Sequence, residues 1–172
     1  MLRARVVVGL GGNLGDVPAA FARAARGIAG VRGVEIAARS GLWRTAPVGP
    51  DAAQPWFWNA AIALRVDAGV TPRALLEALL AIEAGEGRVR GAWRDGPRVV
   101  DLDLLWWGDV CVDEAGLVLP HPRLGARAFA LAPLCEVIGD DAWIPGAGAS
   151  GVLRARAIAA GARVVRVRGD WP

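Results

Sequence analysis

The sequence contains no lysine, because all 20 of its basic residues are arginine. A nucleotide-binding loop of the Walker type needs a lysine on its phosphates, so this class of kinase is excluded. Arginine still suits phosphate, since its planar guanidinium donates hydrogen bonds to two oxygens at once. The modest net charge of +3 is compatible with either a nucleic acid or a small polyanion as ligand.

Cysteine and histidine are scarce as well. Cys111 and Cys135 are isolated, and His121 is the single histidine, so no spacing typical of a zinc site occurs. We therefore expect two buried free thiols and no zinc. His121 stands between two prolines, where a structural role and a phosphate contact are equally open alternatives.

Long apolar segments are also missing. The longest uninterrupted one, residues 128–135, contains a proline and is far too short to cross a bilayer. The N-terminus lacks a full signal-peptide core and a small-residue cleavage site, so we interpret it as a first strand and expect a cytoplasmic location. With 172 residues, 54% of them hydrophobic, the chain fits one globular domain, 1–172.

Strand and helix patterns alternate without regular strand–helix–strand repeats, which favours an α+β fold. A turn is expected at residues 11–15, and Asp16 and Thr71 are expected to cap helices. The expected strands are residues 2–10, 34–44, 56–66, 99–107 and 163–167, and the expected helices are 17–28, 72–84, 128–138 and 152–160.

Two acidic residues alternate with leucines in one expected strand. Asp101 and Asp103 face one side of it, while Leu102 and Leu104 point into the core. Neighbouring carboxylates repel each other unless hard cations lie between them, and Mg²⁺ takes such oxygen ligands together with substrate phosphates. A solvated strand face is the alternative, and the spacing by itself does not decide between the two.

A glycine-rich segment with four arginines, Arg88, Arg90, Arg94 and Arg98, leads into this acidic strand. Phosphoryl transfer depends on neutralising charge, which arginine and magnesium supply together. The glycines suggest a lid that closes over a nucleotide. Taken without the carboxylates, a solvated loop is the commoner explanation.

Phe57 and Asn59 are expected to share one face of a strand, opposite Trp58. A flat aromatic ring beside an amide is suited to stacking on a heteroaromatic ligand and bonding its edge. Core packing is the more common role of such a phenylalanine.

Several segments follow one another in a characteristic order: Gly9–Asp16, Arg44–Pro50, Gln54–Asn59, Ile82–Glu83 with Gly87–Arg90, Gly96–Leu104, Leu119–Arg123 and Arg127–Phe129. With this ordered set, residues 6–138 resemble the hydroxymethyldihydropterin pyrophosphokinase family. The resemblance implies a ferredoxin-like sheet packed with helices, with mobile loops around a substrate cleft. It implies a monomeric enzyme of folate synthesis that binds neither nucleic acid nor membrane and transfers diphosphate from ATP to 6-hydroxymethyl-7,8-dihydropterin, releasing AMP.

The resemblance also implies a role for each matching residue, with two Mg²⁺ ions held by Asp101 and Asp103. These aspartates form the catalytic set with Arg88 and Arg98. ATP would contact Glu83, Arg90, Leu104, His121 and Arg127. The pterin would contact Thr45, Pro47, Val48, Phe57, Asn59 and Phe129, with its ring between the two phenylalanines.

Four positions depart from the family pattern. Gly12 replaces the usual serine, a mild change in a loop, and the segment 50–54 is slightly long. Asp95 stands where some relatives carry an aromatic residue, with Trp93 nearby, and Gly116 falls near a position that is often basic. None of these changes affects the aspartates or the two central arginines, so we expect activity to survive.

Two other functions remain open from the sequence. A nucleic-acid-binding module would use the arginines on a phosphate backbone, but the paired carboxylates would repel that backbone unless metal were present. A catalytically dead relative is disfavoured because the expected catalytic residues are intact. The segment 146–172 resembles nothing specific, and we expect its arginines to be solvated: Arg154, Arg156, Arg163, Arg166 and Arg168.

Overall fold

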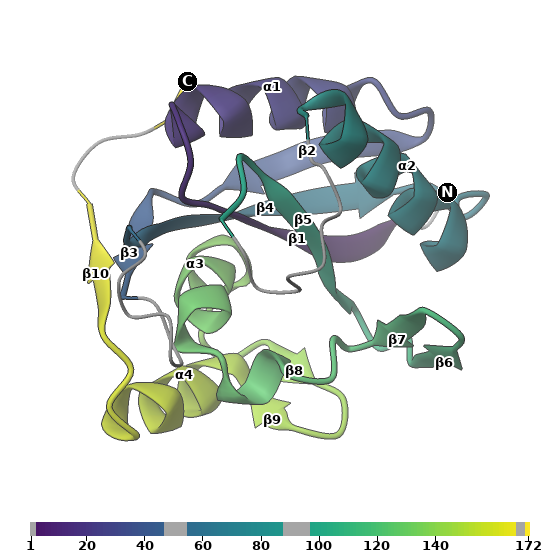
Figure 1. Cartoon of the computed structure of the whole chain (residues 1–172). Coiled ribbons are helices and arrows are strands. Elements are labelled where there is room, and N and C mark those ends of the chain that lie inside the picture. Colours follow the sequence, from purple (N-terminus) through teal and green to yellow (C-terminus); the bar gives the residue numbers. More distant parts are fainter. Residues whose placement is uncertain (1–2, 47–54, 88–96, 168–170) are drawn as a thin grey trace.

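The computed structural model describes residues 3–46, 55–87, 97–167 and 171–172, which form a sheet with helices on both of its faces (Figure 1). In chain order the elements are β1 (Ala4–Gly12), α1 (Val17–Ala29), β2 (Val34–Arg39), β3 (Trp43–Thr45), β4 (Phe57–Val66), α2 (Pro72–Gly85), β5 (Asp101–Trp107), β6 (Val112–Glu114), β7 (Leu117–Leu119), the 3₁₀ turn η1 (Leu124–Ala126), α3 (Ala128–Ile138), β8 (Trp143–Ile144), β9 (Gly148–Ala149), α4 (Ser150–Ala159) and β10 (Val164–Arg166). The predicted α+β fold is confirmed.

The main sheet of the described residues has the strand order β10-β3-β4-β1-β5, and β2 also pairs with β4. Each of these pairings is antiparallel. In the centre, Gly11 of β1 lies opposite Asn59 of β4 on one side and Asp101 of β5 on the other. Three positions that are distant in the sequence therefore form one row across the sheet.

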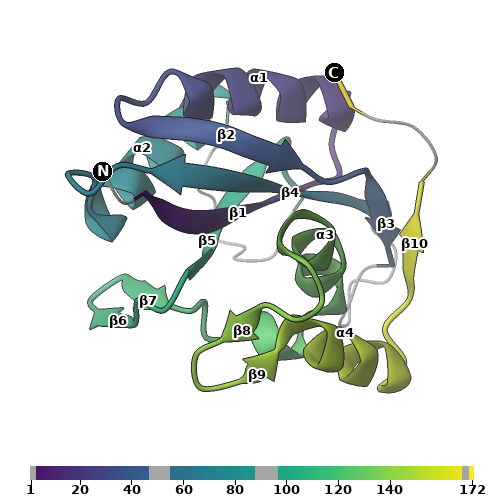
Figure 2. The same ribbon diagram turned by 180° about the vertical axis from the view of Figure 1, so that it is seen from behind.

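The helices cover the two faces in pairs, with α1 and α2 on one face and α3 and α4 on the other (Figures 1 and 2). Both predicted caps are present. The Asp16 carboxylate accepts a hydrogen bond from Ala19 N at 3.1 Å, and the Thr71 hydroxyl accepts one from Ala74 N at 3.2 Å. Each cap satisfies an N–H that the first helical turn leaves without a partner.

Alternation along the strands divides the core between these faces. Ile62 and Leu64 of β4 are buried under α1 and α2, whereas Ala61 packs with Leu131 and Leu134 of α3. Burying each such aliphatic side chain contributes about 1.5–3 kcal/mol. Only side chains that are not packed in either core cluster are therefore available to form a site.

The expected strand 34–44 is wrong as one element, because it divides into β2 and β3. The break lies at Ser40, whose hydroxyl accepts a hydrogen bond from Ala61 N at 2.8 Å. A side-chain oxygen thus takes the place of a backbone acceptor, and the strand ladder is interrupted there. The expected turn at 11–15 also begins too early, since β1 continues through Gly12.

The expectation of two buried thiols is wrong for one of them. Cys135 is buried in α3, and this burial raises the pKa of its thiol. Cys111 is exposed in the segment between β5 and β6. It precedes a hairpin, β6–β7, that strand periodicity did not predict.

The segment after residue 146 is folded against the rest of the structure, with the predicted helix and last strand present as α4 and β10. Leu153 and Ala157 of α4 are buried, β10 pairs with β3, and the ring of Trp171 is 5% exposed. Two of its arginines form ion pairs, Arg154 with Asp140 at 2.8 Å and Arg166 with Glu136 at 2.6 Å. Figure 2 shows β10 running beside β3 at the edge of the sheet. Arg168 lies outside the described residues.

Among the helices that the structure describes, none combines the length and apolar character that crossing a bilayer requires.

Candidate functional site

The two aspartates of β5 lie on the face of the sheet that α3 covers. Leu102 and Leu104 are buried in the opposite core, as the alternation predicts, and Leu105 packs with α3. Asp101 and Asp103 are only partly buried. Their carboxylates therefore share a side of the strand that has not been filled by core side chains.

Glycines of β1 form the floor beside these carboxylates. Gly9 lies opposite Asp103, and Gly11 lies between Asp101 and Asn59. A Cβ on Gly11 would lie 3.7 Å from Asn59 Oδ1, so the missing side chain leaves the space above the strand open. The sequence signal for this surface was the pair of glycines two positions apart in a valine-rich strand. These glycines were not assigned to a site from the sequence.

Asn59 and Thr45 form a buried polar pair at one end of this row. Asn59 Nδ2 donates a hydrogen bond to Thr45 Oγ1 at 3.0 Å, and each residue is 5% exposed. Thr45 lies opposite Phe57 in the pairing of β3 with β4. The structure thus brings together three of the residues predicted to contact a heteroaromatic ring.

Arg98 connects this end to the acidic strand. Its Nη1 lies 2.7 Å from Asp101 Oδ2, and its guanidinium carbon lies 6.0 Å from the centre of the Phe57 ring. Both charged side chains are 18% exposed. Partial burial strengthens such an ion pair relative to one in open solvent, and the aromatic face adds a cation–π contact.

Asn13 holds the backbone of Arg98, a role that the sequence interpretation missed. Asn13 Oδ1 accepts a hydrogen bond from Arg98 N at 3.0 Å, while Asn13 N donates one to Arg98 O at 2.9 Å. Its amide also donates to Pro55 O at 3.4 Å. Asn13 therefore fixes where the Arg98 side chain begins, and its position in the turn after β1 was the only sequence signal.

Glu83, predicted to contact ATP, is 2% exposed on α2. Its Oε1 accepts a hydrogen bond from Leu102 N at 2.5 Å. The buried carboxylate thus supports β5 from the far side, at the residue between the two aspartates. Contact of Glu83 with ATP stays a prediction, and so does that of Leu104, whose side chain is buried in the core.

His121 is held at the end of β5, where its backbone N donates a hydrogen bond to Leu105 O at 2.9 Å. Its Nδ1 accepts one from Arg123 N at 3.2 Å, which assigns the proton of the neutral ring to Nε2. Burial, and then the positive charges of Arg127 and Arg123, lower the pKa of His121 from 6.5 to about 4, although Asp101 acts in the opposite direction. The ring is therefore neutral at pH 7.

Protonation of His121 is expected to destabilise the fold in acid. Because its folded pKa lies below its unfolded value, the unfolded chain takes up the proton first as the pH falls. This contribution to stability is complete above pH 6.5 and is lost progressively as the pH falls toward 4. Urea unfolding at pH 7 and pH 5 should show a smaller loss of stability in His121→Gln than in the wild type. Equal losses would contradict the assignment.

Other predicted site residues fall outside the described part of the chain: Arg88, Arg90, Pro47 and Val48. The departures at Asp95 and in the segment 50–54 do so as well. Arg127 and Phe129 are described, at the start of α3, with the guanidinium carbon 5.3 Å from the centre of the ring. Gly116 forms the turn between β6 and β7, and its φ of 74° explains the glycine.

Gly12 lies at the buried end of β1, so its expected place in a loop is wrong. A Cβ on Gly12 would lie 2.4 Å from the carbonyl oxygen of Val99 and 3.1 Å from Val17 Cγ1. The backbone of residue 99 therefore approaches β1 as closely as a glycine allows. This approach brings the residues before β5 against the floor of the site.

We expect Gly12→Ser to lower the free energy of unfolding by about 1–3 kcal/mol, because backbone atoms must shift to make room. Gly69→Ser is the matched control, since among the described residues nothing lies within 4 Å of a Cβ there. Both changes restrict the unfolded chain equally, so their difference isolates the contact with Val99. Urea denaturation measures it, and equal stabilities of the two variants would refute the contact.

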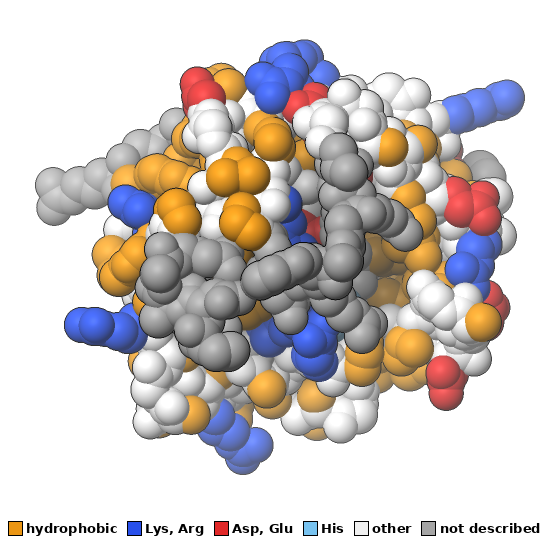
Figure 3. Space-filling model, viewed as in Figure 1, with side chains coloured by type: hydrophobic (Ala, Val, Ile, Leu, Met, Phe, Trp, Pro, Cys, Tyr) orange, Lys and Arg blue, Asp and Glu red, His pale blue; other side chains and the backbone are white. Residues whose placement is uncertain are grey.

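The donor set fits magnesium together with a phosphate ligand. Within the described residues no group of three or more His, Cys, Asp or Glu side chains is placed to hold a metal by itself. Mg²⁺ is commonly bound by one or two carboxylates and completes its shell with water and substrate phosphates. Figure 3 shows acidic and basic side chains together near the centre of this face, an arrangement suited to metal and phosphate.

Comparisons with known proteins point in one direction. Residues 7–139 match the model of the family described as 7,8-dihydro-6-hydroxymethylpterin-pyrophosphokinase. A 2-amino-4-hydroxy-6-hydroxymethyldihydropteridine pyrophosphokinase of Methylorubrum extorquens is 46% identical over 136 residues, which are 79% of this chain and 84% of that protein. A protein of the same name from Synechocystis sp. is 42% identical over 139 residues, covering 80% of this chain and 67% of that protein.

Among solved structures, wild-type HPPK-DHPS of Plasmodium falciparum is similar, with a TM-score of 0.68 and 12% identity. The alignment covers 91% of this chain and 45% of that one, so this chain spans less than half of that structure. At this identity the likeness concerns the fold.

Proposed function

This chain belongs to the 7,8-dihydro-6-hydroxymethylpterin-pyrophosphokinase family, and from this premise we propose how its residues act. The reaction is the transfer of diphosphate from ATP to 6-hydroxymethyl-7,8-dihydropterin in folate synthesis. The pterin hydroxyl oxygen bonds to the β-phosphorus and loses its proton to solvent, the bond from that phosphorus to the α-phosphate oxygen breaks, and AMP leaves. The row Asn59–Gly11–Asp101 carries the proposal, since it sets an aromatic-ring site beside a phosphate site.

The pterin is proposed to bind at the Asn59 end of this row. Its polar edge would face Asn59 and Thr45, whose mutual hydrogen bond of 3.0 Å fixes the direction of the amide. Phe57 and Phe129 would lie against the two sides of the ring, with Pro47 and Val48 nearby. A preformed polar pair among aromatic side chains favours a flat heterocycle that matches its donors and acceptors.

The phosphates are proposed to bind at the other end, over β5. Asp101 and Asp103 would hold two Mg²⁺ ions, which when bound neutralise phosphate charge and polarise the transferred group. Arg98 lies within ion-pair distance of Asp101, so its guanidinium would reach phosphate oxygens held there. Arg88, Arg90 and Arg127 would add positive charge around ATP, and neutral His121 would donate a hydrogen bond from Nε2.

The glycine floor and the buried supports give this arrangement its precision. Gly11 leaves room for substrate close to the backbone, while Glu83 and Asn13 hold β5 and Arg98 from behind. Catalysis of phosphoryl transfer rests mainly on positioning and on charge stabilisation. Fixed positions of β5 and Arg98 would keep the pterin hydroxyl and the β-phosphate of ATP aligned for reaction.

The nucleotide product tests this function. Purified protein with Mg²⁺ and ATP should form AMP only when 6-hydroxymethyl-7,8-dihydropterin is added, with one pterin diphosphate per AMP. ADP in place of AMP would mean transfer of one phosphoryl group, and pterin-independent hydrolysis would remove the pterin from the reaction. A monomeric state, a cytoplasmic location, a single domain and the lack of nucleic-acid binding stay predictions.

A further inference from the structure

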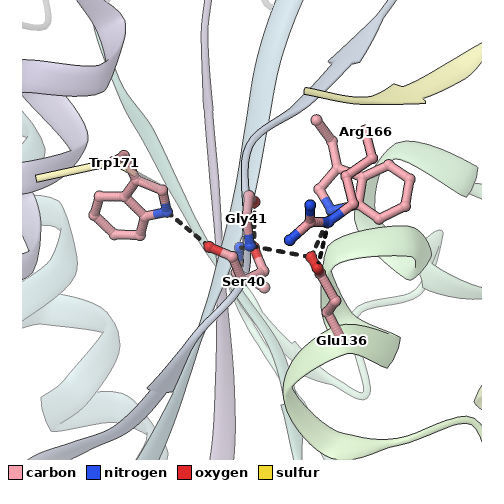
Figure 4. A network of polar contacts seen from close by, with 7 residues as sticks. Ser40, Gly41, Glu136, Arg166 and Trp171 are labelled. Carbon is pink, nitrogen blue, oxygen red and sulfur yellow. Dashed lines mark hydrogen bonds and ion pairs between the residues drawn. The ribbon is translucent and has the colours of Figure 1, made fainter. Parts of the chain in front are cut away.

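Glu136, in the last turns of α3, joins three parts of the chain (Figure 4). Its Oε2 accepts hydrogen bonds from Gly41 N at 3.1 Å and Trp43 Nε1 at 2.8 Å. Its Oε1 accepts one from Arg166 Nε at 2.6 Å. One carboxylate thus holds the segment before β3, the strand β3 itself and the C-terminal strand β10.

The need for this carboxylate follows from the interruption of the sheet at Ser40. Strand pairing stops there, and Glu136 supplies an acceptor for the N–H of the next residue, Gly41. A Cβ on Gly41 would lie 2.6 Å from Arg166 Nη2, so the guanidinium lies directly over this glycine. Charge-assisted hydrogen bonds of this kind are about twice as strong as neutral ones.

The C-terminal segment holds the same bend from its other side. Val167 N donates a hydrogen bond to Leu42 O at 2.8 Å, and Trp171 Nε1 donates one to Ser40 O at 2.8 Å. Figure 4 shows Trp171 on one side of Ser40 and Gly41, with Arg166 and Glu136 on the other. Residues 40–43 are therefore held by α3 and by the end of the chain together.

The two elements that Glu136 joins both lead to the proposed pterin site. On α3, Phe129 and Glu136 are seven positions apart, about two helical turns, and so lie on one stripe of the helix. On β3, Trp43 and Thr45 are two positions apart and face the same side. Glu136 therefore lies on the same side of α3 as Phe129, and the residue that it binds, Trp43, lies on the same side of β3 as Thr45.

We propose that Glu136 is a positioning residue for the pterin site, held in place by the C-terminal segment through Arg166. The inference rests on the proposed function, because it takes Thr45, Phe57 and Phe129 to contact the pterin. Glu136 sets the distance between α3 and β3, and with it the gap into which the ring fits. The two aspartates of the proposed phosphate site lie on β5, which β4 and β1 separate from β3 in the sheet.

Glu136→Gln tests the proposal, since glutamine keeps an acceptor for Trp43 but loses the charge that binds Arg166. The Kd and KM for 6-hydroxymethyl-7,8-dihydropterin should rise about 10-fold, equivalent to about 1.4 kcal/mol. The KM for ATP and kcat should change less than about 2-fold, a split that a general loss of stability does not produce. Arg166→Ala should change the pterin constants in the same direction.

Glu35→Gln is the matched control, because Glu35 is an exposed glutamate of β2 that forms ion pairs with Arg3 and with Arg65 of β4. It should leave the pterin constants unchanged. If Glu136→Gln does not fold, Trp43→Phe replaces it, since that change removes one donor to Glu136 and keeps an aromatic ring. Pterin binding by calorimetry and steady-state AMP formation give the two independent readouts.

Failure of the proposed function would look different from failure of this inference. Wild-type protein that neither binds the pterin nor forms AMP from it would overturn both. An active wild type with unchanged pterin constants in Glu136→Gln and Arg166→Ala would overturn the inference alone. Parallel losses in pterin binding, ATP binding and kcat would also overturn it, because they would make Glu136 a general support of the fold.

Discussion

Asp101→Asn is expected to lower kcat for AMP formation by about 10²–10³-fold, or about 3–4 kcal/mol of transition-state stabilisation. Asparagine keeps the shape of the side chain but removes one of the two negative charges on this face of β5. It also removes the charged partner of Arg98, now 2.7 Å away. Both the metal site and the guanidinium beside it therefore lose their arrangement.

The dependence of the rate on Mg²⁺ concentration separates this explanation from a loss of folded protein. The variant should need more Mg²⁺ for half-maximal rate, while its unfolding midpoint stays close to that of the wild type. Asp113→Asn on β6 is the matched control, because Asp113 is an exposed aspartate of another strand. An unchanged Mg²⁺ dependence in Asp101→Asn would refute a metal-binding role for this carboxylate.

The sequence was sufficient where local chemistry determines the structure. The alternation of Asp101 and Asp103 with leucines placed both carboxylates on one face, because strand geometry leaves no other arrangement. Asp16 and Thr71 were recognised as caps because each is a capping residue type at the start of a helical pattern with a proline in its first turn. The long helices were also predicted, because their apolar residues recur with the helical period along the sequence.

Contacts between distant segments could not be predicted from one sequence. Glu83 has the appearance of a surface glutamate on a helix, and only the packing of α2 against β5 brings it to Leu102 N. The break at Ser40 depends on Ala61 of the neighbouring strand, so the residues 34–44 gave no local sign of it. Gly12 likewise is required only because the backbone of Val99, distant in the sequence, packs directly against it.

Trp171 is buried although nothing in its sequence context predicts burial. A tryptophan next to the last residue, after an arginine-rich segment, gave no periodic pattern from which burial could be inferred. In the structure its ring packs edge-on against Phe21 of α1, with centroids 5.8 Å apart, and its Nε1 donates to Ser40 O. The chain end thus completes the core between α1 and the edge of the sheet.

Trp171→Ala is accordingly expected to lower the free energy of unfolding by about 3–5 kcal/mol, because it removes a buried ring and leaves Ser40 O without its donor. For a chain of this size the change corresponds to a fall in Tm of about 6–20 °C. Trp143→Ala is the matched control, since Trp143 is 62% exposed on β8 and its loss should cost less than about 0.5 kcal/mol.

Urea and thermal unfolding of the two tryptophan variants decide the question. Similar stabilities would mean that the end of the chain is not part of the folded core. If Trp171→Ala lowers the free energy of unfolding strongly and also raises the pterin KM, the effect reaches β3 through the bend at residues 40–43. Since Arg39 lies 5.1 Å from the same ring and donates to Pro172 O, Arg39→Ala should weaken the docking of the chain end in the same direction.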